Sequence, residues 1–264
     1  MVGGRPLPRL GVRAQYLRLA FRRVFGQMPP GAISLRCPRV DLHVHKNPWR
    51  LYKEIFLQGC YEPLVPLGPK PRILDIGANI GLASLYFLSR WPATRLTAWE
   101  PNPEAFDLLN RNVRSEMHPE AELNIEAKAL SDSDGPVQFL VPAGNPTAVY
   151  AGIPREGSAP DSASRNVMVM AADAARIFAG PADLLKLDIE GHEYAVLEHA
   201  VPNSSEIRSL AVEFHRVGRN RERVERLVTR LVDEGRYQVV DGTGRPFSLH
   251  SLPDRKGSLL LRFY

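Results

Sequence analysis

The sequence predicts an α/β protein with a doubly wound, mostly parallel sheet, an antiparallel C-terminal edge and an N-terminal helical appendage. Three observations lead to this fold class. Short apolar segments alternate with helical patterns from residue 72 to residue 232. The first of these segments runs into a glycine turn that opens a helix. After the last helix the chain closes with two apolar segments, which form an antiparallel pair at the edge of such a sheet.

The first forty residues differ from the rest in charge. They contain eight arginines, no lysine and no acid, so the net charge of +5 leaves −3 for the remaining chain. Within them, residues 13–26 form a predicted amphipathic helix with an apolar stripe beside three arginines. We favour packing of this helix on the main domain or on a second subunit of a homo-oligomer. Contact with an anionic membrane surface and a targeting role are the alternatives.

The next segment leads to the first core strand. An alternating stretch at residues 41–45 precedes a predicted helix from Trp49 to Leu57. Prolines at positions 63, 66, 69 and 71 then stiffen the chain. We therefore divide the protein into an N-terminal helical or lid segment, residues 1–69, and a main domain, residues 70–264.

The main domain alternates strands and helices in order. The core strands cover residues 72–76, 95–99, 123–129, 184–189 and 209–214, with a terminal pair at 237–240 and 258–263. The principal helices cover residues 82–89, a segment that Asn102 caps and Pro103 begins, and an amphipathic segment at 224–232 that Gly235 closes. Shorter elements are strands at 137–141 and 167–170 and a helix at 171–178. Residues 142–165 form a long loop of the kind that serves as a lid or recognition segment.

Composition limits the function classes. The 264 residues are 44% hydrophobic, which supports a core of ordinary size. No apolar run reaches the roughly 18 residues of a membrane-spanning helix. Cys37 and Cys60 are too few for a disulfide framework or a cysteine zinc site. The slightly acidic main domain argues against a nucleic-acid substrate. We therefore predict a cytoplasmic protein with no nucleic-acid partner.

The turn after the first strand carries the clearest chemical signal. Residues 75–81 read Asp-Ile-Gly-Ala-Asn-Ile-Gly, and about 20 residues later the second strand ends on Glu100. Glycines at such a turn let the backbone approach a ligand, and the acid accepts hydrogen bonds from ribose hydroxyls. The pattern is typical of a pocket for an adenosine-bearing cofactor. A strand–turn–helix corner without a ligand is the alternative, and the spacing to Glu100 argues against it.

The side chains of this turn discriminate among adenosine cofactors. Asn79 stands where the dinucleotide fingerprint has its middle glycine, and a side chain there crowds a pyrophosphate. Asp75 favours a cationic ligand over an anionic one. S-adenosylmethionine fits both observations, because it has no phosphate and carries an ammonium and a sulfonium group. A nicotinamide-dependent oxidoreductase is the alternative enzyme, and Asn79 argues against it.

A second group of polar residues belongs to the later core strands. Acids and histidines follow the strand at 184–189 and end the strand at 209–214, namely Asp188, Glu190, His192, Glu193, Glu213 and His215. In doubly wound sheets both strand ends face the ligand cleft. Methyl transfer from a sulfonium to a hydroxyl needs an aligned oxygen and a proton acceptor. We expect His215 or Asp188 to be that base, with Glu190 beside them, while Asp188 alternatively binds the amino group of the cofactor.

Several of these residues also fit roles other than catalysis. His192 is equally well explained as a surface histidine at a helix start, and Glu193 is favoured in a first helical turn by the helix dipole. Asp188, Glu190 and His215 are of types that also occur around metal ions. Because acids at this spacing are common without a metal, we predict no metal site.

Taken together, these segments resemble the FkbM family of S-adenosylmethionine-dependent methyltransferases. The resemblance covers most of residues 40–215, and the joint occurrence of its blocks in order makes it specific. The blocks are YKEIF (52–56) with YEP (61–63), LDIGANIG (74–81), EPNP (100–103), ALSD (129–132), LKLDIEGHE (185–193) and EFH (213–215).

The resemblance implies a class I, Rossmann-like methyltransferase fold. It also implies O-methylation of a small-molecule hydroxyl acceptor such as a sugar or a polyketide natural product. By position it assigns the methionine side of the cofactor to Asp75, Gly77, Asn79 and Gly81, the ribose to Glu100, the adenosine to Asn102, and the adenine edge to Ser131 and Asp132. It implies no single general base. A cofactor-binding partner subunit without turnover is the remaining alternative.

Overall fold

The computed structural model describes residues 32–34, 39–41, 51–115, 118–142, 152–153, 164–233, 237–252 and 257–264. The predicted helix at 13–26, most of the long loop at 142–165 and the predicted helix end at Gly235 lie outside these residues. In the described part of the chain, no helix has both the length and the apolar composition that crossing a membrane requires.

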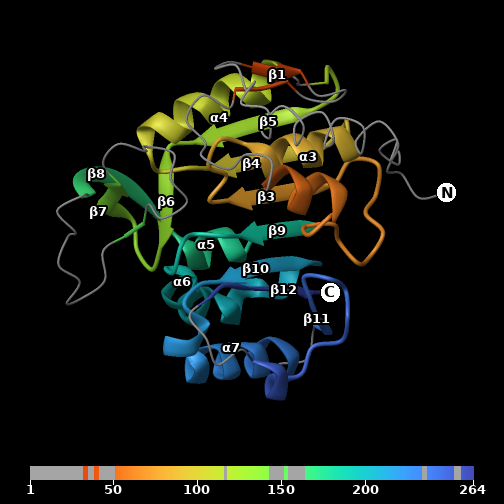
Figure 1. Ribbon diagram of the computed structural model, residues 1–264, viewed down its shortest axis with the longest axis vertical. Helices are drawn as coiled ribbons and strands as arrows, with labels where there is room; N and C mark the ends of the chain where they lie inside the picture. Colours follow the sequence, from red (N-terminus) through yellow and green to blue (C-terminus); the bar gives the residue numbers. More distant parts are fainter. Residues whose placement is uncertain are drawn as a thin grey trace, which may run out of the picture.

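A seven-stranded sheet forms the centre of the molecule, in the order β5–β4–β3–β9–β10–β12–β11 (Figure 1). β12 runs antiparallel to β10 and β11, and the other hydrogen-bonded pairs of this sheet are parallel. The order reverses between β3 and β9, which confirms the predicted doubly wound sheet with an antiparallel edge. The strands are β3 (Arg72–Ile76), β4 (Arg95–Trp99), β5 (Glu122–Glu126), β9 (Leu184–Leu187), β10 (Leu210–Phe214), β11 (Val239–Asp241) and β12 (Leu259–Phe263).

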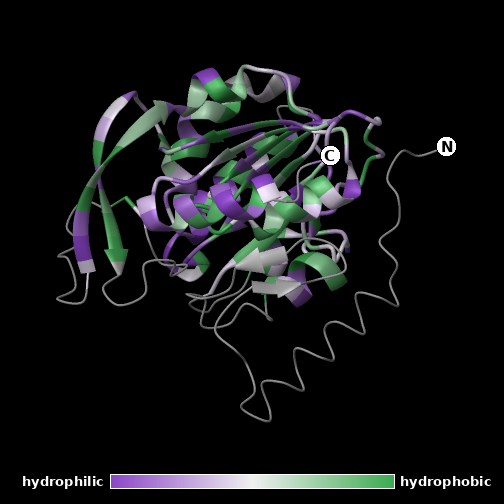
Figure 2. Ribbon diagram, turned by 90° about the horizontal axis from the view of Figure 1, so that it is seen from above, coloured by the Kyte–Doolittle hydropathy of each residue, from purple (hydrophilic) through white to green (hydrophobic). Residues whose placement is uncertain are grey.

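Helices cover both faces of the sheet. In β3, Ile73 packs in one hydrophobic core with α3 and α4, whereas Leu74 and Ile76 pack in another with α6 and α7. Strands covered on both faces are mainly apolar, and hydrophobic residues predominate in the central strands in Figure 2. The helices are α3 (Leu82–Arg90), α4 (Pro103–Ser115), α5 (Ala174–Phe178), α6 (Glu193–Ala200) and α7 (Arg221–Asp233), with 3-10 turns η2 (Val201–Glu206), η3 (Val217–Arg219) and η4 (Leu249–Ser251).

The strand predicted at 123–129 is wrong, because the chain changes sheets at Ala127. β5 stays in the central sheet, and the next segment, β6 (Lys128–Ser131), leaves it. β6 pairs with β8 (Ser164–Asp173), which also pairs with β7 (Gly135–Pro142). This three-stranded sheet stands at the carboxyl ends of the central strands (Figure 1).

The helix predicted at 171–178 is shorter than expected. β8 continues to Asp173, because residues 170–173 pair with β6. α5 then begins at Ala174, and the Asp173 carboxylate accepts a hydrogen bond from the Ala175 N–H at 2.8 Å as its N-cap. Pairing with a strand forty residues away therefore overrides the local helical pattern.

The described part of the N-terminal segment packs into the core of the main domain. The helix predicted over 49–57 is present in its described part, where residues 51–52 are α-helical and Lys53–Leu57 forms a π-helical segment, η1. The Phe56 ring stacks on Tyr52 and meets Tyr86 of α3 edge to face. Ile55 and Tyr61 join the same hydrophobic core. A short antiparallel pair, β1 (Ala32–Ser34) and β2 (Arg39–Asp41), precedes this segment in the chain.

Candidate active site

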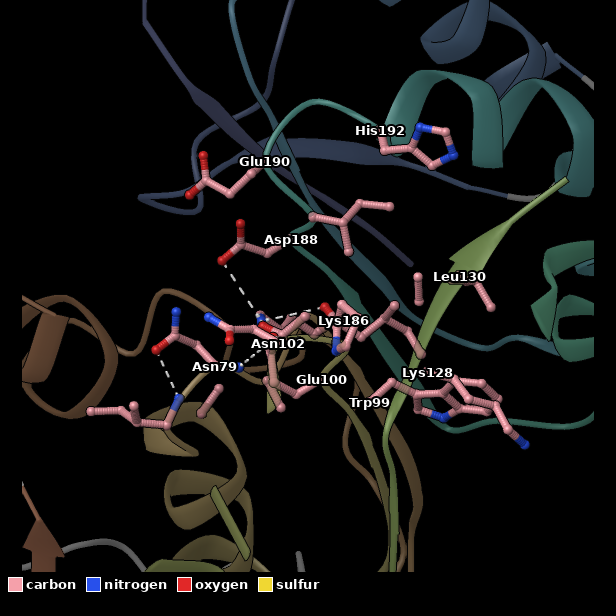
Figure 3. Close-up of a pocket in the computed structure, with 18 of the residues that line it drawn as sticks. Asn79, Trp99, Glu100, Asn102, Lys128, Leu130, Lys186, Asp188, Glu190 and His192 are labelled. Carbon is pink, nitrogen blue, oxygen red and sulfur yellow. Dashed lines mark hydrogen bonds and ion pairs between the residues drawn. The ribbon is translucent and has the colours of Figure 1, made fainter. Parts of the chain in front are cut away.

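A cavity opens where the strand order of the central sheet reverses, at the carboxyl ends of β3, β4 and β9. Its empty space, counted together with the solvent at its open side, is about 940 Å³. The glycine turn and the end of β4 line one side, the small sheet a second, and the loop after β9 a third (Figure 3). Leu51, Ile55 and Tyr61 of the N-terminal segment complete the lining.

Close packing determines both glycines of the turn. Gly77 has a φ of +75°, and a Cβ atom there would lie 1.8 Å from the backbone oxygen of Asp188. The Gly77 N–H donates to the Trp99 carbonyl at 3.0 Å, which ties the turn to the end of β4. Gly81 has a φ of +91° but does not line the cavity. A Cβ atom there would lie 2.9 Å from Leu109 of α4, so Gly81 has a packing role, and its predicted contact with the cofactor remains a prediction.

Glu100 ends β4 with its carboxylate held from two sides. Its Oε2 accepts a hydrogen bond from the Asn79 N–H and its Oε1 from the Asn102 N–H, each at 2.8 Å. The residue is 6% exposed, and burial raises the pKa of its carboxyl to about 7 although both bonds lower it. A carboxylate oxygen has room for a further hydrogen bond, which suits two ribose hydroxyls. Glu100, Asn79 and Asn102 line the cavity.

Two asparagines shape the backbone around Glu100. Asn79 is left-handed, with a φ of +51°, and its Oδ1 accepts a hydrogen bond from the Ile80 N–H at 2.8 Å. That bond occupies a donor near the N-terminus of α3, where a dinucleotide would place its pyrophosphate. Asn102 caps α4 as predicted, since its Oδ1 accepts from the Glu104 N–H at 3.2 Å.

Asp75 is fully buried and does not line the cavity, in contrast to its predicted contact with the cofactor. Its Oδ2 accepts a hydrogen bond from Ser84 at 2.6 Å, and its Oδ1 lies 3.1 Å from the Lys186 ammonium. Lys186 does line the cavity and also donates to the Gly77 carbonyl at 2.7 Å. Burial lowers the pKa of Lys186, but Asp75 and Asp188 outweigh it and raise the pKa, so the ammonium stays charged.

Lys186 is a site residue without a predicted role in the sequence analysis. The signal for it is a lysine in the middle of the apolar strand β9. A buried charge in such a strand must have a charged partner. Asp75 on the adjacent strand β3 is paired with Lys186 in register.

Ser131 and Asp132 are not among the residues that line the cavity, and their predicted contact with adenine remains a prediction. The Ser131 hydroxyl lies 3.3 Å from His192 Nε2, and Asp132 is exposed. Lys128 and Leu130 of β6 line the cavity instead (Figure 3). The change of sheet at Ala127 brings Lys128, Ala129 and Leu130 of β6 to the cavity.

The loop after β9 brings Asp188, Glu190 and His192 to the cavity (Figure 3). Glu190 adopts a left-handed backbone, with a φ of +55°. Burial raises the pKa of its carboxyl to about 8, although the positive charge of His215 lowers it. At neutral pH the neutral form of Glu190 therefore predominates, and the ionised form that can accept a proton grows as the pH rises towards 8 and above.

His215 lies behind this loop and does not line the cavity. Its Nε2 is 3.4 Å from Glu190 Oε2 and 3.8 Å from Asp188 Oδ1. Burial lowers the pKa of the imidazole, but the carboxylates of Glu193, Asp188 and Glu190 outweigh it and raise the pKa to about 9. A histidine that is protonated at neutral pH is a poor proton acceptor, which argues against the expected role of His215 as the base.

Glu193 connects two parts of the fold, in addition to its place in the first turn of α6. It is fully buried at the start of α6, and its Oε2 accepts a hydrogen bond from the Gly191 N–H at 2.6 Å. Its Oε1 accepts from the His215 N–H at 2.6 Å, so one side chain joins the start of α6 to the end of β10.

Among the described residues, Asp188, Glu213 and His215 have side-chain atoms of metal-binding type within 4.8 Å of one another. Two other groups, an ammonium and a hydroxyl, already interact with the carboxylates of Asp188 and Glu213. The Lys186 ammonium lies 3.7 Å from Asp188, and the Tyr61 hydroxyl reaches both acids. The prediction of no metal at this site remains a prediction.

Comparison with known proteins places the chain among methyltransferases. The family model of the methyltransferase FkbM domain matches residues 75–237. Methyltransferase sdnD of Sordaria araneosa is 46% identical over 63 residues, which are 24% of this chain and 24% of that protein. The 31-O-demethyl-FK506 methyltransferase FkbM of Streptomyces tacrolimicus is 36% identical over 84 residues, 30% of this chain and 32% of that protein. The matches thus span about a third or less of these curated relatives.

Among solved structures, the methyltransferase FkbM from Methylobacillus flagellatus KT aligns with 82% of this chain and 54% of its own, with a TM-score of 0.49 and 16% identity. The family model, by contrast, matches more than half of the chain and includes the glycine turn, Glu100 and the loop after β9. The chain therefore belongs to the FkbM methyltransferase family.

Proposed function

We propose that this protein transfers a methyl group from S-adenosylmethionine to a hydroxyl group of a small molecule. Membership of the family supports methyl transfer. The observation that carries the choice of cofactor is Glu100, a buried carboxylate that two backbone N–H groups aim into the cavity beside the glycine turn. This arrangement suits the two hydroxyls of a ribose.

The residues of the cavity fit the remaining parts of this cofactor. The apolar side chains of Leu130 and Phe139 suit an adenine ring. Lys186 and Asp188 lie beyond Gly77 and carry the charges that would pair with the carboxylate and ammonium of the methionine part. When bound, S-adenosylmethionine supplies a methyl group that is already activated by its sulfonium.

Glu190 is the residue that suits the proton transfer. It lines the cavity, and the protonated His215 at 3.4 Å stabilises its ionised form. Asp188 is less suited, because Tyr61 and Lys186 already engage its Oδ2. Glu190 takes the hydroxyl proton as the acceptor oxygen bonds to the methyl carbon and the carbon–sulfur bond breaks.

Calorimetric titration with S-adenosylmethionine tests the cofactor assignment. Glu100→Ala removes two charge-assisted hydrogen bonds to ribose, so we expect a loss of about 2–4 kcal/mol, or roughly 30- to 1,000-fold in affinity. Glu122→Ala is the matched control, because Glu122 lies on the neighbouring strand and its side chain is 70% exposed. Unchanged affinity of the Glu100 variant, or binding of reduced nicotinamide dinucleotide at the same site, would contradict the proposal.

A transfer assay tests the acceptor class. Purified protein and methyl-labelled S-adenosylmethionine are incubated with panels of neutral sugars, hydroxylated macrolides, amines and carboxylic acids. Mass spectrometry locates the added methyl group. Methylation of hydroxyls supports the proposal, whereas methylation confined to nitrogen or carboxylate oxygen overturns that part of it.

A further inference from the structure

Tyr61 lies at the cavity but belongs to the N-terminal segment, before the residues that match the family model. It is 5% exposed and is one of the few polar groups that this segment contributes to the lining. Its hydroxyl lies 3.2 Å from Asp188 Oδ2 and 3.4 Å from Glu213 Oε2. Its ring centroid is 5.5 Å from the Lys186 ammonium.

The two acids near this hydroxyl come from adjacent parallel strands, β9 and β10, which bring like charges together. Burial and the charge of Asp188 raise the pKa of the Glu213 carboxyl. A phenol has one proton, so Tyr61 donates to one of the two oxygens at a time. Burial and both acids raise the pKa of Tyr61 well above its usual value, so it remains a donor.

Other titratable groups also face this pair of acids. The positive ones are Lys186 and His215. The remaining ones are Asp75, Glu190, Glu193 and Cys60. Lys186 also forms an ion pair with Asp75 and donates to the Gly77 carbonyl. His215 also forms ion pairs with Glu190 and Glu193. Tyr61 is the neutral donor that spans both acids.

We propose that Tyr61 is a positioning residue that holds the carboxylates of Asp188 and Glu213 together and so presents Asp188 to the amino group of the cofactor. The inference rests on the proposed function only in the last step, the contact between Asp188 and the cofactor. It gives the N-terminal segment a direct part in the site: the segment supplies the hydrogen bond that lets two neighbouring strand ends both carry an acid.

Thermal unfolding of Tyr61→Phe tests the first part without any ligand. Removing the donor raises the pKa of the acid pair, and a carboxyl with a raised folded pKa destabilises the protein as pH rises above its unfolded value. We expect the Tm deficit of the variant to be about 3 °C larger at pH 8 than at pH 5, corresponding to roughly one pKa unit. Tyr237→Phe is the matched control. Its buried hydroxyl lies 2.7 Å from the Ile207 carbonyl and 3.2 Å from the Ser204 carbonyl, away from the cavity, so its deficit is expected to be equal at both pH values.

A second substitution separates positioning from packing. In the Tyr61→Phe background, Glu213→Gln removes one charge and supplies an amide donor to Asp188. We expect it to restore the Tm at pH 8. Tyr61→Phe alone should weaken binding of S-adenosylhomocysteine about tenfold, and the double variant should recover to within about threefold of wild type.

A deficit of Tyr61→Phe that is equal at pH 5 and pH 8, or no recovery in the double variant, would overturn the proposal. If the wild-type protein binds no S-adenosylhomocysteine, the proposed function fails instead. The comparison of melting temperatures still decides the role of Tyr61 in that case, because it needs no ligand.

Discussion

Three non-glycine residues with left-handed backbones stand out at the scale of single residues. Among the described residues these are Asn79, Glu190 and Arg216, with φ values of +51°, +55° and +55°. They follow the ends of β3, β9 and β10, the three strands in the middle of the sheet. Such conformations cost on the order of 1 kcal/mol or more and cluster at functional sites. At Asn79 the backbone N–H donates to Glu100, and Glu190 lines the cavity.

The pKa of Glu190 leads to a prediction at this scale. A base acts in its ionised form, so with a pKa of about 8 we expect kcat/KM to rise as pH increases from 7 to 9. Glu190→Gln should lower the rate about 100-fold or more and abolish this rise. His215→Ala removes the charge that lowers the pKa of Glu190, so the rise should move to higher pH.

The pH dependence of methyl transfer, measured at saturating S-adenosylmethionine, checks this prediction. Glu198→Gln on the exposed side of α6 is the control, since its carboxylate pairs with Arg223 at the surface. A rate for Glu190→Gln close to that of wild type would exclude Glu190 as the base and return the role to Asp188.

At the scale of elements, the junction between α6 and β10 depends on one side chain. Glu193 accepts hydrogen bonds from two backbone N–H groups, and Glu193→Ala leaves both buried without that acceptor. We expect a loss of about 3 kcal/mol in the free energy of unfolding. Glu198→Ala, on the same helix and 40% exposed, should cost less than about 1 kcal/mol.

Urea denaturation measures both losses. Because Glu193 raises the pKa of His215, the variant should also show a lower imidazole pKa in an NMR titration. A loss of stability without a change in the His215 titration would mean that the ion pair between the two side chains is not formed.

At the scale of the whole molecule, charge is separated along the chain. Residues 1–31 hold six arginines and no acid, so removing them changes the net charge from +5 to −1. Among the residues that the structure describes, those that line the cavity begin at Leu51. We therefore expect the shortened protein to bind S-adenosylmethionine within about twofold of the full chain.

Calorimetry on both proteins checks this expectation, and a large loss of affinity would give the first residues a part in the site. Flotation with anionic vesicles distinguishes the roles considered for residues 13–26. Flotation of the full chain alone would favour membrane contact over packing on the main domain or on a second subunit.

Local sequence patterns were enough to predict the order of the core elements, the glycine turn and the position of Glu100. These features have local causes: periodic apolar residues, caps such as Asn102, and a turn that only a few residue types allow. The family resemblance, confirmed by the match over residues 75–237, rests on the same short blocks. None of these blocks is longer than the nine residues of the segment 185–193, so each is a local feature of the sequence.

Which of the candidate residues meet at the cavity became clear from the folded structure. It paired Asp75 with Lys186, placed Lys128 and Leu130 of β6 in the lining, and surrounded His215 with carboxylates. It also brought Tyr61 to Asp188 across 127 positions of sequence. A side chain's burial and charge depend on neighbours contributed by other strands, and those neighbours exist only once the sheet has formed.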